Sequence, residues 1–359
     1  MTGRLLAVGG GMGLGVVHCG RPYGYEGALV ETDPAVRKRA AEAMGIPAYA
    51  TVPEALAAHS DLVGAYIATP NHTHAGLAVA LAAADIPVFM EKPLGISDEE
   101  CRAVCDAYRG RRGWLQIDFE YRFSPLYAVA NDVLHSGEVG QLRSIYAEYT
   151  VGNYRPSYTW RLDPDRAGGL FCEKLCHFMD LFRFWSRSEY AEMRVTAGPR
   201  GMDYYDPRST DNLTAQFWME NGVFVNLIHT HGSTALPRDS RIQNAGWTDY
   251  GHRLAVSLNT TAGCILIDIW RQHITLVRRD PEDDMAPRVL RRIDFSHMDF
   301  MASHHDMAGM LKDFVRRVHE GAGPRLPLED SSRTMTAVFA CDRQLRAACA
   351  EANARVKRG

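Results

Sequence analysis

The fold is decided near the start of the chain, where Arg4-Leu5-Leu6-Ala7-Val8 is followed by Gly9-Gly10-Gly11-Met12-Gly13-Leu14-Gly15. The first of these segments predicts a buried strand, and a helix is expected to open at residues 16–20. Five of the seven residues in the second segment are glycines, so the backbone of this turn can approach a ligand without obstruction by side chains. Gly9, Gly11 and Gly15 have the spacing G-x-G-x-x-x-G, one residue longer than the G-x-G-x-x-G of dinucleotide-binding turns.

Strands and helices alternate through the first 120 residues. Further strands are expected at residues 27–31, 62–68 and 87–90, and helices at 35–44, 75–84 and 97–109. Residues 62–68 form a continuous apolar run, as in a strand buried on both faces. Ser97 and Glu100 have the spacing of a capping box at the start of the last helix. This alternation predicts an α/β fold with a Rossmann-type, doubly wound parallel sheet in residues 1–120.

An acidic residue, Glu31, ends the second predicted strand, where dinucleotide-binding sheets hold the adenosine ribose. Its carboxylate would accept hydrogen bonds from the ribose hydroxyls and would repel a 2′-phosphate, so the pattern favours NAD over NADP. The alternative is a solvated acid at a strand end. In the glycine turn, the residues expected at the cofactor are Gly9, Gly11, Met12, Gly13 and Gly15.

After about residue 120 the apolar residues recur with period two, which is typical of antiparallel strands. Such strands are expected at residues 142–150, 194–197, 213–219, 223–231, 254–258, 264–270 and 273–278. Helices are expected at residues 126–135, 177–185, 307–319 and 331–350. Residues 121–359 are therefore predicted to form an α+β domain with an open, mainly antiparallel sheet, and its last helices could pack back on the first domain.

The composition excludes several classes of protein. The chain has 359 residues, of which 46% are hydrophobic and 23% charged, as in ordinary globular proteins. The net charge of −3 argues against a nucleic-acid-binding protein, which usually carries a basic surplus. No apolar run is long enough to span a membrane, so we expect no membrane association. The use of cysteine predicts a cytoplasmic location.

The eight cysteines do not form a disulfide framework in a chain of this length, which also agrees with a reducing compartment. Cys172, Cys176 and His177 have a spacing that zinc could use on one helix face. No second cluster completes four ligands, and we therefore favour buried small side chains and no metal.

Four motifs resemble those of a known family, the Gfo/Idh/MocA oxidoreductases (relatives of glucose-fructose oxidoreductase and inositol dehydrogenase). They are ATPNHTH at residues 68–74, EKPLG at 91–95, Trp160-Arg161, and GGL at 168–170 leading to EKLCHFMD at 173–180. The resemblance implies hydride transfer to or from a sugar or cyclitol carbon, and a C-terminal sheet that often forms a homodimer or homotetramer interface. It also places further residues at the cofactor, namely Thr69, Pro70, Asn71, His74, Glu91 and Lys92.

Two residues in these motifs suit the handling of a hydroxyl proton. Lys92 follows a parallel strand, at the edge where open α/β sheets bind ligands, and in the family the bond between it and Pro93 is often cis. His177 is the better proton acceptor near neutral pH. Glu173 stands where the family pattern D-x-x-x-H has its acid, in a subgroup version E-K-x-x-H, and on a helix it would share a face with His177. The alternatives are an exposed strand-end lysine and a structural histidine.

Weaker site candidates lie in the second half of the chain. The resemblance places Tyr121 and Arg122 beside the active site, and Trp160 with Arg161 could stack on and hydrogen-bond a sugar ring. A metal site could be built from His229, His231, His304 and His305, although substrate-facing or solvated histidines are commoner.

The sequence thus predicts an NAD-dependent oxidoreductase of a sugar, sugar derivative or cyclitol. Lys92, His177 and Glu173 are the expected catalytic residues, and Lys92, Tyr121, Arg122, Trp160, Arg161, Glu173 and His177 are expected at the substrate. One alternative is a redox-neutral glycosidase or eliminase that forms a transient 3-keto sugar. Another is a non-catalytic nucleotide sensor.

Overall fold

The computed structural model describes residues 3–152, 159–201, 206, 208–233, 253–269, 271–280, 282–283 and 286–356. The chain divides into two compact units. Unit 1 contains residues 1–119, 165–168 and 307–339, and unit 2 contains residues 120–164, 169–306 and 340–359. Residues 307–339, which lie in the second half of the sequence, thus belong to the first unit.

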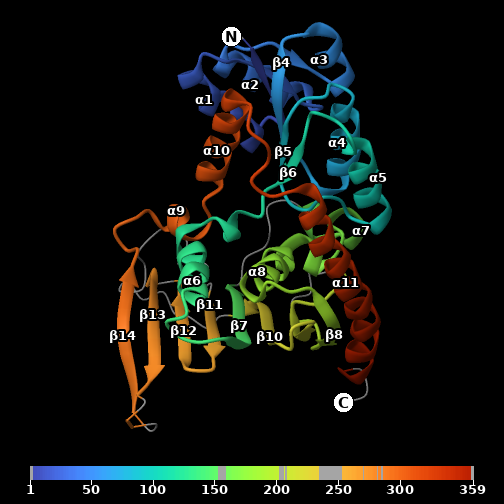
Figure 1. The fold of residues 1–359 in the computed structure, drawn as a ribbon. Helices are drawn as coiled ribbons and strands as arrows, with labels where there is room; N and C mark the ends of the chain where they lie inside the picture. Colours follow the sequence, from blue (N-terminus) through green and yellow to red (C-terminus); the bar gives the residue numbers. More distant parts are fainter. Residues whose placement is uncertain are drawn as a thin grey trace. The chain divides into compact units, whose positions relative to one another are not determined.

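Unit 1 is built on a six-stranded sheet in which every neighbouring pair of strands is parallel (Figure 1). Its order is β3-β2-β1-β4-β5-β6, which is the Rossmann order and confirms the predicted doubly wound sheet. The strands are β1 (Arg4–Val8), β2 (Glu26–Val30), β3 (Ala48–Tyr49), β4 (Leu62–Ile67), β5 (Val88–Met90) and β6 (Leu115–Ile117).

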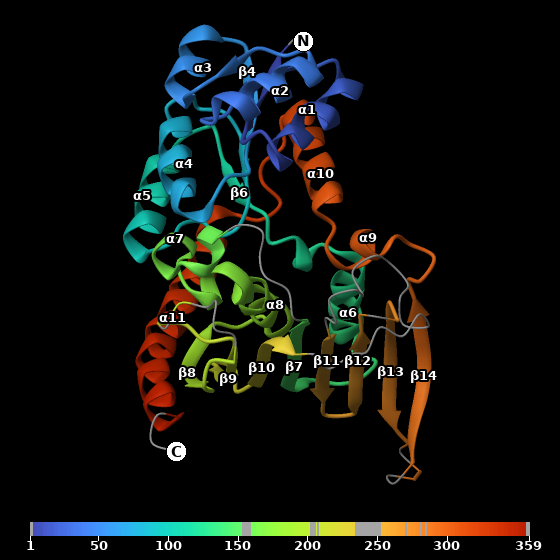
Figure 2. The ribbon, with the colours of Figure 1, turned by 180° about the vertical axis from the view of Figure 1, so that it is seen from behind.

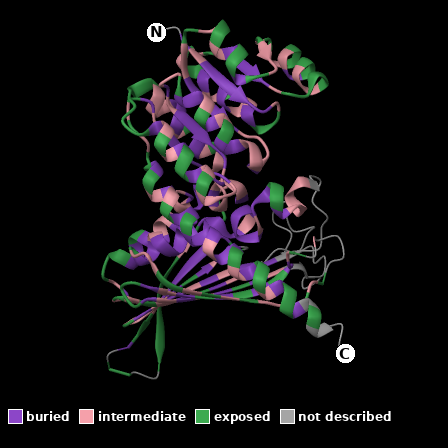
Figure 3. Ribbon diagram, turned by 90° about the vertical axis from the view of Figure 1, so that its right-hand side faces the viewer, coloured by how far each residue is buried: buried purple, intermediate pink, exposed green. Residues whose placement is uncertain are grey.

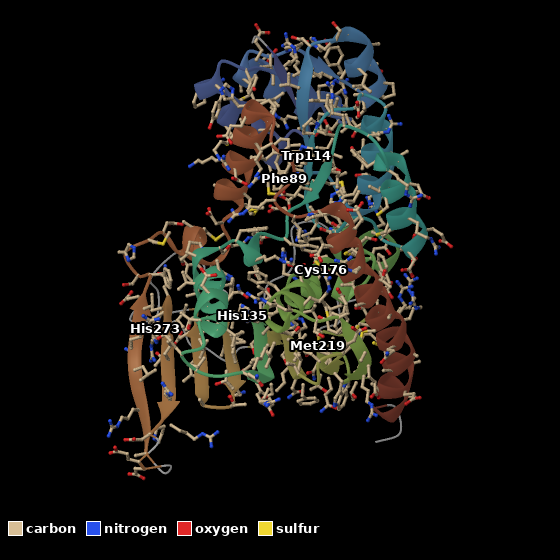
Figure 4. All side chains as sticks on the ribbon, viewed as in Figure 1. Phe89, Trp114, His135, Cys176, Met219 and His273 are labelled. Carbon is tan, nitrogen blue, oxygen red and sulfur yellow. The ribbon has the colours of Figure 1, made fainter. Side chains whose placement is uncertain are left out.

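Helices cover both faces of this sheet. On one face α1 packs with α10, and on the other α4 packs with α5 (Figures 1 and 2). The helices of unit 1 are α1 (Gly15–Gly20), α2 (Pro34–Met44), α3 (Val52–Ala58), α4 (His74–Ala82), α5 (Asp98–Tyr108) and α10 (Met307–Glu320). An aromatic cluster ties α10 to the sheet: the rings of Phe89 and Trp114 each lie 5.6 Å from that of Phe314. Figure 4 labels Phe89 and Trp114.

The predicted capping box of α5 forms with one change. The Ser97 side chain accepts the Glu100 N–H, as expected, but the Glu100 carboxylate accepts the N–H of Ile96. The carboxylate therefore caps the residue that precedes the N-cap.

Unit 2 contains an eight-stranded sheet of order β14-β13-β12-β11-β7-β10-β9-β8. Only β7 and β10 are parallel neighbours, so the prediction of a mainly antiparallel sheet is confirmed. The strands are β7 (Leu142–Gly152), β8 (Tyr190–Ala197), β9 (Asn212–Met219), β10 (Phe224–Ser233), β11 (Arg253–Thr260), β12 (Gly263–Asp268), β13 (His273–Arg279) and β14 (Pro287–Asp294). No strand was predicted at β14, because this edge strand is exposed along nearly its whole length and lacks an apolar alternation.

Helices lie on one face of this sheet, and the side chains alternate accordingly (Figure 3). In β7, for example, Ile145 and Ala147 are buried while Tyr146 between them is 48% exposed. The remaining helices are α6 (Pro125–His135), α7 (Pro164–Ala167), α8 (Cys176–Ser186), α9 (Phe300–His304) and α11 (Leu328–Val356), and the division between the units falls inside α11. A π-helical turn, Phe171–Leu175, leads directly into α8.

No helix in the described part of the chain is both long and apolar enough to cross a membrane.

Candidate active site

The glycine turn lies at the point where the strand order of unit 1 reverses. It follows β1, whose neighbour β4 is followed by Thr69 and Pro70. Gly9 has φ +110°, and a Cβ at this position would lie 2.3 Å from the Ala68 carbonyl oxygen, so the turn requires glycine here. A Cβ on Gly11 would meet nothing within 4 Å. The backbone at Gly11 is thus open, as a turn that receives a pyrophosphate must be.

Glu31 lies against the same turn. One carboxylate oxygen accepts the N–H of Gly10 at 2.8 Å, and the other accepts the N–H of Asp33 at 2.9 Å. The oxygen that faces Asp33 also accepts the Thr32 hydroxyl at 3.4 Å, whereas the oxygen that faces Gly10 keeps a further lone pair that can accept a ribose hydroxyl. The open glycine backbone and the anchored carboxylate together fit an NAD cofactor in unit 1.

The loop after β4 is tied to the loop after β5 by a buried histidine. Nδ1 of His74 lies 2.8 Å from the Pro93 carbonyl oxygen, and Nε2 lies 2.8 Å from the Thr69 carbonyl oxygen. Burial lowers the pKa of His74. Asn71 is also buried and donates to the Ala167 carbonyl at 3.0 Å. Both residues hold loops together, and their contact with the cofactor stays a prediction.

Glu91 and Lys92 follow β5 at the same edge of the sheet. The buried Glu91 carboxylate accepts the Tyr66 hydroxyl at 2.5 Å. Lys92 is partly buried, and the peptide bond between it and Pro93 is cis, as the resemblance implied. Lys92 thus lies at the C-terminal end of a parallel strand, where open α/β sheets bind ligands.

His177 in α8 faces an acid that the sequence analysis did not single out. Its Nδ1 lies 3.3 Å from one carboxylate oxygen of Glu120, and Nδ1 of His305 lies 2.5 Å from the other. Burial alone would raise the pKa of Glu120, but His177 and His305 outweigh it and lower this pKa to about 2. The Tyr121 ring stacks on the imidazole of His177, with centroids 4.5 Å apart and planes 19° apart.

Residues 115–123, LQIDFEYRF, alternate apolar with polar side chains, and the signal available for Glu120 was its place in this run directly before Tyr121. The partner histidine, His305, is 185 residues further along the chain, and no local spacing connects the two.

Arg122 is held by another residue of α8. Its guanidinium donates two hydrogen bonds to the carboxylate of Asp180, at 2.7 and 2.6 Å, and lies 5.3 Å from the ring centroid of Phe184. The Asp180 side chain is almost fully buried. This bidentate pair fastens the segment that carries Glu120 to the helix that carries His177.

Glu173 lies in the π-helical turn and is flanked by two cations. Arg161 donates to one carboxylate oxygen at 2.7 Å, and the Lys174 ammonium lies 3.6 Å from the other. Arg161 also lies 5.1 Å from the ring centroid of Trp160. The structure therefore brings Trp160, Arg161 and Glu173 together, while Glu120 is the acid that it places against Nδ1 of His177.

His229 on β10 is fully buried near Lys174. Its Nδ1 donates to the Tyr149 carbonyl at 3.0 Å, and no described residue pairs with its buried Nε2. Burial, reinforced by Lys174, lowers the pKa of His229 to about 3, so the ring is neutral and Nε2 is an acceptor.

In the described residues no group of three or more His, Cys, Asp and Glu side chains could hold a metal ion. The side chain of His231 lies outside the described residues. Nδ1 of His304 lies 2.7 Å from the Tyr127 hydroxyl, and His305 faces Glu120. All eight cysteines are free, and Cys172 and Cys176 are fully buried, as expected of small core side chains.

Comparison with known proteins agrees with both halves of the fold. A family model described as "Oxidoreductase family, NAD-binding Rossmann fold" matches residues 25–119, and one described as "GFO/IDH/MocA C-terminal domain" matches residues 127–246. The fold thus defines a protein with an NAD-binding Rossmann domain and an α+β partner domain. The chain belongs to the Gfo/Idh/MocA oxidoreductase family.

Named relatives include two bacterial dehydrogenases. The chain is 28% identical over 160 residues to levoglucosan dehydrogenase of Pseudarthrobacter phenanthrenivorans, covering 44% of this chain and 41% of that one. It is 30% identical over 189 residues to inositol 2-dehydrogenase 2 of Saccharopolyspora erythraea, covering 52% and 53%. The matches therefore span about half the length of these relatives.

A solved levoglucosan dehydrogenase in complex with NADH and levoglucosan has a similar fold. Its TM-score is 0.76 at 18% identity, covering 98% of both chains.

Proposed function

We propose that this protein is an NAD-dependent dehydrogenase that oxidises a secondary alcohol carbon of a sugar, sugar derivative or cyclitol. The observation that carries the proposal is His177, a buried imidazole whose Nδ1 faces a carboxylate, in a family of NAD-binding oxidoreductases. The relatives named as levoglucosan and inositol dehydrogenases support the class of substrate.

In this proposal NAD, held by the glycine turn and Glu31, supplies the hydride acceptor when it is bound. The Nε2 atom of His177 accepts the proton of the reacting hydroxyl, because Nδ1 is turned toward Glu120. The Lys92 ammonium polarises the same oxygen and stabilises the negative charge that develops on it. Glu173, held by Arg161 and Lys174, accepts a hydrogen bond from a second hydroxyl.

The test is a screen of sugars, glycosides and inositols with NAD and with NADP. Both the absorbance of reduced nicotinamide and the release of product are recorded. The Lys92→Ala variant is assayed in parallel with wild type. We expect net NAD reduction by wild type and a loss of about 10²- to 10⁴-fold in kcat/KM in the variant. Equal rates for the two proteins on every active substrate would refute the assignment of Lys92.

Release of product without a net change in the absorbance of reduced nicotinamide would show that the protein is a redox-neutral glycosidase or eliminase and not a dehydrogenase. Binding of NAD without turnover of any polyol would instead identify a nucleotide sensor.

We further propose that the protein forms a homodimer or homotetramer through the sheet of unit 2. Tyr146, Ile228 and Leu266 lie on the sheet face opposite the helices and are 48%, 44% and 42% exposed. Apolar side chains gathered on one face favour burial against another copy. Sedimentation of wild type as a monomer would refute this proposal, and dissociation by Ile228→Lys would support it.

The eight free thiols also favour a cytoplasmic location.

A further inference from the structure

A single buried carboxylate lies between two imidazoles in unit 2. Glu120 is 1% exposed, and its two oxygens face Nδ1 of His177 at 3.3 Å and Nδ1 of His305 at 2.5 Å. The three residues come from separate segments: the short helix before α6, the first turn of α8, and the residue that follows α9.

An imidazole that turns Nδ1 toward a carboxylate carries its proton on Nδ1 and leaves the lone pair of Nε2 free. The carboxylate also stabilises the imidazolium that forms when Nε2 accepts a proton. We propose that Glu120 is a positioning residue that fixes His177 in this tautomer, and that His305 tunes the basicity of His177 by sharing the same carboxylate. This inference rests on the proposed function of His177.

Counting protons and charges shows why it matters for the basicity of His177 that Glu120 also faces His305. When the hydroxyl proton moves to Nε2 of His177, the Nδ1 proton stays on the ring, and the imidazolium is neutralised by Glu120. One carboxylate neutralises one imidazolium, so a protonated His305 opposes a second positive charge on His177. Even neutral, His305 weakens Glu120 as an acceptor for His177, because it draws on the same negative charge.

The other groups around the carboxylate leave this balance intact. Tyr121 stacks on His177, and Tyr127 reaches His304. Burial raises the pKa of both tyrosines well above the ordinary value, so both stay neutral. Tyr149 on β7 and Cys176 on α8 are further titratable neighbours of Tyr121, and Asp306 directly follows His305 in the chain. The nearby charge of Arg122 is neutralised by its bidentate pair with Asp180.

A carboxylate is an expensive group to bury for a structural tie alone. Its transfer from water costs several kcal/mol unless charges and hydrogen bonds compensate, whereas a glutamine would link the same segments with no charge. A fully buried acid whose compensation comes from two histidines, one of them His177 on α8, is an arrangement typical of functional sites.

The test compares Glu120→Gln and His305→Leu with wild type on the best polyol found in the screen, measuring kcat, KM and the pH profile of kcat/KM. For Glu120→Gln we expect kcat to fall by about 10²- to 10⁴-fold. Its acid limb should move to lower pH, because the negative charge that favours the imidazolium is gone. For His305→Leu the acid limb should move to higher pH, because Glu120 then serves His177 alone. In neither variant should KM change by more than about threefold, because no substrate contact is lost.

His273→Leu is the matched control, since it removes another buried histidine of unit 2, on β13. It should leave the pH profile of wild type unchanged. Glu120→Asp keeps the charge and should recover part of the kcat that Glu120→Gln loses. If Glu120→Gln fails to fold, the shift in His305→Leu still decides the question.

Acid limbs that stay in place, or that move in the same direction in both variants, would overturn the proposal. So would a Glu120→Gln enzyme that keeps more than half of the wild-type kcat. A second readout needs no substrate: ¹⁵N spectra of histidine-labelled protein should show His177 protonated at Nδ1 in wild type, and the opposite tautomer would also overturn the proposal. A wild type that oxidises no polyol but shows the Nδ1 tautomer would refute only the proposed function.

Discussion

The glycine turn of unit 1 and the surroundings of His177 in unit 2 are built in opposite ways. The turn uses backbone: Gly9 at φ +110° lies against Ala68, and Glu31 accepts the N–H of Gly10. The His177 site uses side chains that come from distant parts of the sequence, with Glu120 and His305 on one carboxylate.

The difference lies in what each site requires of its neighbours. A backbone turn is specified by residues next to one another, and a substitution acts through strain at that position. A side-chain cluster is specified by packing, and a substitution acts through the charge or cavity that it leaves behind. The two sites should therefore respond differently to mutation.

The largest effect is expected from breaking the ion pair that fastens the His177 site. Asp180→Asn leaves the Arg122 guanidinium buried without its counter-charge, and we expect a loss of about 3–5 kcal/mol in the free energy of unfolding. Denaturant unfolding followed by circular dichroism measures it. The double variant Arg122→Met/Asp180→Leu removes both charges and should recover most of the loss. A single variant as stable as wild type would show that this pair does not hold the site.

A smaller effect is expected in the glycine turn, where two glycines serve as a matched pair. Gly9→Ala places a Cβ 2.3 Å from the Ala68 carbonyl oxygen at a positive φ, and should cost about 2–3 kcal/mol. Gly11→Ala meets no protein atom within 4 Å and should leave stability within about 0.5 kcal/mol while weakening NAD binding. Thermal unfolding and calorimetric NAD titration separate the two. Equal destabilisation by both would contradict the strain argument.

The same contrast explains how far the sequence could be interpreted. Four strands of unit 1 (β1, β2, β4 and β5), the cofactor turn and the position of Lys92 follow from local patterns that alternate in a fixed order along the chain, whereas the short strands β3 and β6 were not predicted. Glu120 and β14 could not be found this way. The first acquires its role only when His305 is folded against it, and the second is an exposed edge strand with no apolar period. Glu173 was predicted from the motif, but its cation partners, Arg161 and Lys174, depend on a π-helical turn that the spacing does not reveal.

The acid stability of unit 2 provides a third test. His229 has its pKa lowered to about 3 by burial and by Lys174, so the unfolded chain binds a proton below about pH 6.5 that the folded chain does not. Stability present above pH 6.5 should therefore be lost as the pH falls, by about 1.4 kcal/mol per pH unit for this group. Glu120, with its pKa lowered to about 2, adds a loss between about pH 4.5 and 2. Buried Asp342, whose pKa is raised to about 7, gives the opposite slope between about pH 7 and 3.8, so the loss due to His229 is read from the difference between wild type and a His229 variant in the midpoint of urea unfolding against pH.

His229→Gln is the variant that isolates the first window. It should flatten the slope between about pH 6.5 and 3, so that the loss remaining between about pH 4.5 and 2 is that of Glu120 alone. A slope identical to that of wild type would mean that His229 titrates as an exposed histidine does.

The smallest effect is expected at Glu31, because one carboxylate contributes only part of the cofactor's recognition. Glu31→Ala removes an acceptor for the ribose hydroxyls and the charge that repels a 2′-phosphate, so NAD binding should weaken and NADP binding should strengthen. We expect the preference for NAD to narrow about tenfold, which corresponds to about 1.4 kcal/mol. Calorimetric titration of both cofactors measures it, and Glu26→Ala, at the opposite end of β2, is the control. If Glu31→Ala keeps the wild-type preference for NAD over NADP, cofactor choice depends on the backbone of the glycine turn and not on the Glu31 carboxylate.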